Sequence, residues 1–70
     1  MQSSHTDSNM EPLRERFLKT YANIPLQLRD EIILVFEGDP VTWKVAYLEV
    51  KANSPLGEKL LQELNQMQLI

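Results

Sequence analysis

A chain of 70 residues with 43% hydrophobic and 24% charged residues has room for one small domain, and a domain of this size buries only about 60% of its unfolded surface. It has no cysteine, which excludes disulfides and thiolate metal sites, and its net charge of −3 argues against nucleic acid as the default partner. No apolar stretch approaches the roughly 20 residues of a membrane span, so no contact with a membrane is expected. We expect a cytoplasmic protein, and no cofactor is predicted.

The N-terminal segment is polar. Residues 1–9 lack apolar periodicity and hold the one histidine, His5, which predicts a disordered tail ahead of a single compact domain over 10–70. With only this histidine available, no zinc site can be completed. Neither a metal site nor a catalytic histidine is expected.

The first helix is predicted over residues 11–22. Pro12 suits a first turn, where its missing N–H would have no partner in any case. An apolar stripe follows at a spacing of four residues, formed by Leu13, Phe17 and Tyr21. Pro25 ends the helix, because the residue before a proline avoids the helical conformation.

A short turn of helix near 25–30 and a strand over 31–37 are expected next. The apolar run Ile32 to Phe36 is rich in β-branched residues and reads as a buried strand, with Gly38-Asp39-Pro40 as the turn behind it. Val41 and Thr42 would return as a brief second strand and complete a hairpin.

The segment from Val41 to Val50 fits either a strand or a helix. Read as a helix capped by Thr42, it places its apolar residues at i, i+3, i+4 and i+7 without conflict, so a helix over 43–52 is preferred. The last helix, over 55–67, has the clearest signal, because Ser54 suits the N-cap and Pro55 the first helical position.

These elements predict an α+β fold, a small helix-rich single domain in which one short β-hairpin packs on three to four helices. The predicted core consists of Leu13, Phe17, Tyr21, Ile33, Val35, Trp43, Ala46, Tyr47, Val50, Leu60, Leu61 and Leu64.

Four acidic residues bracket the predicted strand: Asp30, Glu31, Glu37 and Asp39. They could hold a divalent cation, but they lack the spacing of a calcium loop, and we interpret them as solubilising the strand and guarding it against edge pairing. Nucleophilic catalysis lacks an activating histidine in the folded region, so no enzyme is predicted and no catalytic residue is assigned.

The leading functional prediction is a non-enzymatic protein-interaction module that self-associates as a homodimer or binds another protein. Surplus apolar residues near the C-terminus would form its surface, namely Leu56, Met67, Leu69 and Ile70. The alternative is a DNA-binding regulator resembling a helix-turn-helix protein, although Glu58 at the start of its recognition helix would face phosphate unfavourably.

Overall fold

The computed structural model describes residues 2–70, and the side chains of residues 10–70. In chain order the elements are α1 (Gln2–Ala22), the 3-10 turn η1 (Leu26–Leu28), β1 (Ile32–Phe36), β2 (Asp39–Thr42), α2 (Trp43–Lys51) and α3 (Pro55–Gln66). The prediction of a small α+β domain with one antiparallel hairpin is confirmed. Within the described residues there are three α-helices, since the expected fourth is a single 3-10 turn too short to pack as a helix.

α1 starts at Gln2 and not near Glu11, and Pro12 lies inside it. A proline in the interior of a helix removes one intrahelical hydrogen bond but does not always end the helix, so Pro12 is compatible with a helix start and does not fix one. The predicted disordered tail, residues 1–9, falls outside the residues whose side chains the structure describes, and it stays a prediction.

A two-residue turn joins the two strands. Glu37 has φ 52° and Gly38 has φ 88°, the pair of positive values that a type I′ hairpin turn requires. The turn therefore lies earlier in the chain than the predicted Gly38-Asp39-Pro40. It consists of Glu37 and Gly38, whereas Asp39 and Pro40 belong to β2. Glycine supplies one of the two left-handed conformations without a steric penalty.

The two C-terminal helices begin at the caps that the sequence predicts. The Val45 N–H donates to the Thr42 hydroxyl at 3.1 Å, and the Gly57 N–H donates to the Ser54 hydroxyl at 2.9 Å. The helical interpretation of the segment after Val41 is confirmed, and both helices end within one residue of the predicted position. Side-chain caps satisfy N–H groups that have no partner within the helix.

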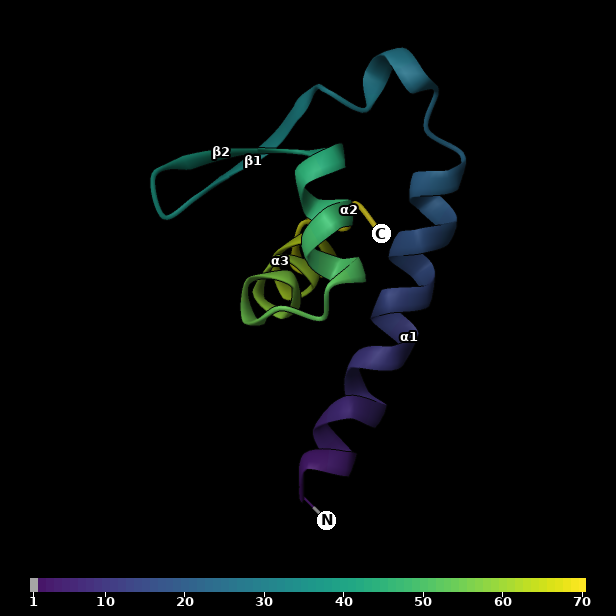
Figure 1. Ribbon diagram of the computed structural model, residues 1–70, viewed down its shortest axis with the longest axis vertical. Coiled ribbons are helices and arrows are strands. Elements are labelled where there is room, and N and C mark those ends of the chain that lie inside the picture. Colours follow the sequence, from purple (N-terminus) through teal and green to yellow (C-terminus); the bar gives the residue numbers. More distant parts are fainter. Residues whose placement is uncertain (1) are drawn as a thin grey trace.

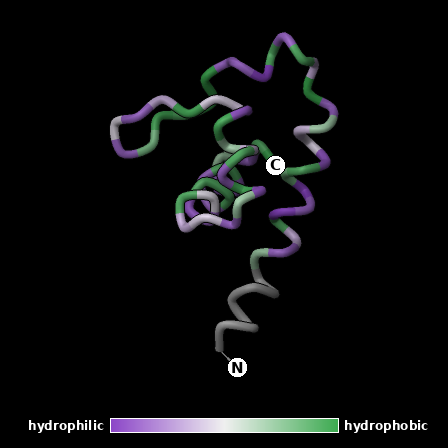
Figure 2. The backbone as a smooth tube through the Cα atoms, viewed as in Figure 1, coloured by the Kyte–Doolittle hydropathy of each residue, from purple (hydrophilic) through white to green (hydrophobic). Residues whose placement is uncertain are grey.

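The core lies where the three helices meet. α2 packs against α3, and α1 lies beside both (Figure 1). The largest fully buried side chains come from all three helices and are Phe17, Val50, Leu60, Leu61 and Leu64. Apolar residues recur along every helix instead of gathering in one segment (Figure 2), as expected for amphipathic helices around a shared interior.

Aromatic side chains join α1 to α2. The rings of Tyr21 and Tyr47 stack with centroids 4.3 Å apart and planes 9° apart, and Phe17 lies beside Tyr21 and Trp43. Arg29 covers the ring of Tyr21, with its guanidinium carbon 4.4 Å from the ring centroid. This stack holds the segment that follows α1 against the helices and fixes where the hairpin starts.

The hairpin projects from the helices on the side away from α1 (Figure 1). Its strand β1 is buried on one face only, which corrects two sequence predictions. The strand was expected to be buried throughout with Val35 in the core, yet Val35 is 66% exposed and Leu34 points inward. The reason is that successive side chains of a strand point to opposite faces, so Val35 faces outward when Leu34 faces the core.

Candidate protein-interaction surface

The outer face of the hairpin carries exposed apolar side chains. In the antiparallel pairing Ile32 lies opposite Thr42, and Val35 lies opposite Pro40. Residues that are paired across strands share a face, and so do residues two apart in β2, so Ile32 and Val35 lie on one face. They are 62% and 66% exposed. Large apolar side chains that are this open, side by side, are the usual mark of an interaction site.

A β-bulge creates this face. The register shifts between Ile32 and Leu34, which leaves Ile33 without a direct partner on β2. In a regular strand Ile32 would share its face with Leu34, whose side chain is buried. The extra residue instead turns Ile32 outward beside Val35. Sequence reasoning missed this face because the continuous apolar run was interpreted as a buried strand.

The two free edges of the hairpin are not equivalent. Pro40 has no N–H, so its pair with Val35 is of the non-hydrogen-bonded kind, and the polar backbone atoms of both residues point away from the partner strand. On β2 this removes the donor in the middle of the free edge, at Pro40, which blunts that edge. On β1 it leaves the N–H and C=O of Val35 aimed outward, and residues 32–36 contain neither proline nor charge.

Two further apolar side chains are exposed on α2. The Thr42 hydroxyl links the hairpin to the first turn of that helix, where Val45 is 41% exposed, and Leu48 follows one turn later at 55%. We call Ile32, Val35, Val45 and Leu48 the apolar strip. The β1 edge supplies backbone donors and acceptors, and the apolar strip supplies exposed side chains.

Acidic residues stand at both ends of β1. Asp30 and Glu31 precede the strand. Glu37 is the first residue of the turn that follows it, and Asp39 is the first residue of β2. All four side chains are exposed. Because they lie at opposite ends of a strand, they do not converge, and within residues 10–70 no three Asp, Glu or His side chains gather as metal ligands would. What they provide is a negative charge on either side of an apolar edge.

The predicted C-terminal surface is only partly open. Met67 and Leu69 are exposed, whereas Leu56 and Ile70 are half-buried and pack against the core of the same chain. Leu69 is held near the end of α3 by its N–H, which donates to the Leu64 carbonyl at 2.9 Å. The four residues therefore do not form one exposed face.

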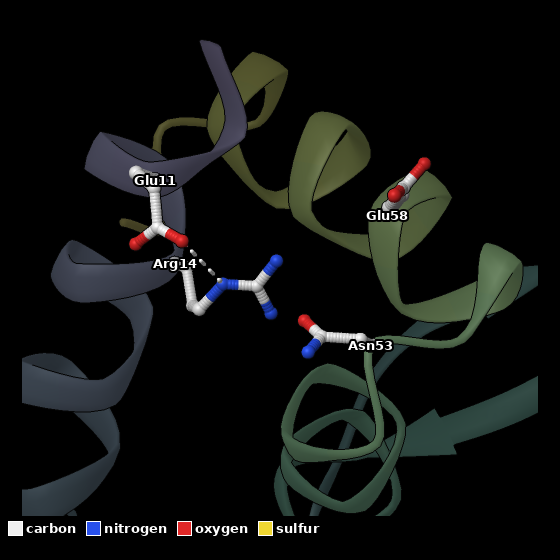
Figure 3. A pocket seen from close by; sticks show the side chains of 4 residues that line it. All are labelled: Glu11, Arg14, Asn53 and Glu58. Carbon is white, nitrogen blue, oxygen red and sulfur yellow. Dashed lines mark ion pairs between the residues drawn. The ribbon is translucent and has the colours of Figure 1, made fainter. Parts of the chain in front are cut away.

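A polar hollow of about 310 Å³ lies between α1 and the loop that joins α2 to α3. Figure 3 shows the Arg14 guanidinium reaching from α1 toward Asn53, with Glu11 behind it and Glu58 on the far side. Arg14 lies 3.7 Å from Glu11 and donates to the Val50 carbonyl at 2.9 Å. The guanidinium is thus occupied in holding the last turn of α2 to α1, and the lining offers no nucleophile paired with a base.

The cations of α1 are used in a similar way. Beside Arg14, Arg16 donates to the Asn65 side chain of α3 at 3.0 Å. Two of the basic side chains that could meet phosphate therefore tie helices of the chain together, and the first turn of α3 carries Glu58. DNA binding stays an alternative prediction.

No protein-family model, no curated protein and no solved structure is significantly similar to this chain. None of the helices in the described part of the chain combines the length and the apolar character that crossing a bilayer requires. The features of this chain that suggest a function are the apolar strip and the β1 edge.

Proposed function

We propose that this chain is a non-enzymatic protein-interaction module that binds an extended segment of another protein by strand addition at the β1 edge. The outward backbone N–H and C=O of Val35 would bond the added strand, and the apolar strip would receive its alternate side chains. The observation that carries the proposal is the inequality of the edges, with β2 blunted by Pro40 and β1 left open.

The energetics of the hairpin favour the same function. A two-stranded hairpin is marginally stable, and this one has an apolar face without a covering element. A third strand would complete backbone hydrogen bonds and remove apolar surface from water in one step. Binding would therefore stabilise the fold as well as the complex.

The test is a selection of linear peptides, displayed on phage, against the immobilised full chain. We expect enrichment of peptides with alternating apolar residues, and loss of their binding in Val35→Lys, which places a charge at the edge. Lys59→Glu, at an exposed position of α3, is the control for a changed surface charge. The proposal fails when no peptide is enriched, or when the enriched peptides bind Val35→Lys as well as they bind the unaltered chain.

Self-association through the C-terminal apolar residues is a second proposal, supported by the exposure of Met67 and Leu69. Sedimentation equilibrium over a wide concentration range tests it. A dimer that dissociates in Met67→Lys would support this interface. A monomer at every concentration, or a dimer indifferent to that change, would dispose of it.

A further inference from the structure

Resting on the proposed function, we infer that the β1 edge selects extended segments with basic residues at both ends and disfavours a second copy of this chain. The inference concerns the chemistry of the partner. It starts from the acidic residues that bracket β1 and from the absence of charge within the strand.

The charge around the edge is negative on balance. From Arg29 to Lys44 the chain holds four acidic and two basic residues. One of the two basic groups is engaged, because Arg29 donates to the carbonyls of Ile24 and Tyr21 and covers the Tyr21 ring. Lys44 is exposed on the first turn of α2 near the start of β1, where its backbone N–H donates to the Arg29 carbonyl at 3.0 Å, and it is one exposed cation against four exposed carboxylates. The exposed acidic residues at the two ends of β1 therefore dominate what an added strand would meet.

A second copy would meet the same charges. Two β1 strands related by a two-fold axis run antiparallel, and a pairing centred on Leu34 places Glu31 of each copy opposite Glu37 of the other. Side chains directly opposite each other lie about 5 Å apart, and like charges at that separation destabilise the pairing.

A segment with basic ends meets the opposite situation. Lysine or arginine on either side of a short apolar core would lie across from Glu31 and Glu37, where opposite charges stabilise a cross-strand pair. The apolar core would lie along residues 32–36, which carry no charge. Electrostatic complementarity of this kind sets which partners are accepted, and like-charged partners are rejected.

The experiment uses each selected peptide in three versions, with its flanking residues changed to lysine, glutamine or glutamate. Binding to the full chain is measured by fluorescence anisotropy at low salt and at about 0.15 M, where screening acts over roughly 8 Å. We expect the lysine version to bind at least about tenfold more tightly than the glutamate version at low salt, with the ratio shrinking at higher salt. In Glu31→Gln/Glu37→Gln the ratio should fall toward one.

The matched control is Glu15→Gln/Glu63→Gln, which changes the net charge equally on α1 and α3 and should keep the preference. Equal, Val35-dependent binding of all three versions would overturn the charge selection while leaving strand addition intact. A dimer that disappears in Val35→Lys would overturn the rejection of a second copy. Absence of any peptide binding would instead overturn the proposed function itself.

Discussion

Gly57 of α3 lies directly against the backbone of Glu49 in α2. A Cβ atom at position 57 would stand 2.5 Å from the Glu49 carbonyl oxygen and 2.7 Å from its carbonyl carbon. From the sequence alone, this glycine only weakens the first turn of a helix. In the structure it is what allows α3 to approach the end of α2, because both obstructing atoms are backbone and cannot rotate away.

Gly57→Ala should therefore destabilise the fold although alanine is the better helix former. We expect a loss of about 1–3 kcal/mol, since the overpacking outweighs the roughly 1 kcal/mol of helix propensity that is gained. Urea unfolding followed by circular dichroism measures the change, with Lys59→Ala on the exposed side of α3 as the control. A stabilised Gly57→Ala would show that the two helices do not approach this closely.

Ser54 combines a cap with a hydrogen bond to an acid. Its hydroxyl accepts from the Gly57 N–H and donates to the Glu49 carboxylate at 2.6 Å. Ser54→Ala should cost about 1 kcal/mol through loss of the cap. Ser54→Asp keeps a capping oxygen but places two carboxylates together, so it should also destabilise, and adding Glu49→Gln should restore the stability. Thermal unfolding of the four proteins decides this, and no recovery in the double variant would contradict it.

Regular alternation after the bulge makes the neighbouring positions Leu34 and Val35 respond oppositely. Leu34→Thr puts a hydroxyl into the buried face and should cost at least about 2 kcal/mol. Val35→Thr keeps a β-branched residue on the exposed face and should change stability by less than about 0.5 kcal/mol. Urea unfolding of the two variants compares them directly. The reverse order of effects would mean that Val35 points inward and Leu34 outward.

Arg29 holds the end of α1 to the start of the hairpin. Its Nε donates to the Ile24 carbonyl at 3.1 Å and its Nη2 to the Tyr21 carbonyl at 3.3 Å, while the guanidinium covers the Tyr21 ring. Lysine cannot make these contacts together, so Arg29→Lys should cost about 1–2 kcal/mol. The exposed Arg16→Lys, which loses one bond at the surface, should cost less than about 0.5 kcal/mol. Equal melting temperatures for the two variants would refute the assignment.

Local chemistry in the sequence determined most of the helical part of this fold. Thr42 and Ser54 cap their helices because an N-cap oxygen bonds an N–H only three residues further on, and the apolar spacing of α3 buries Leu60, Leu61 and Leu64 as predicted. Such contacts join neighbours in the chain, so a reader of the sequence sees both partners at once.

Tertiary structure alone decided the candidate surface. Whether Ile32 and Val35 face outward depends on the pairing of β1 with β2, where one extra residue reverses the faces of those before it. Pro40 and the acidic residues around the strand are visible in the sequence, but their meaning follows from which edge each one occupies. The close approach at Gly57 is of the same kind, because it depends on how tightly two helices pack, and no local propensity encodes that distance.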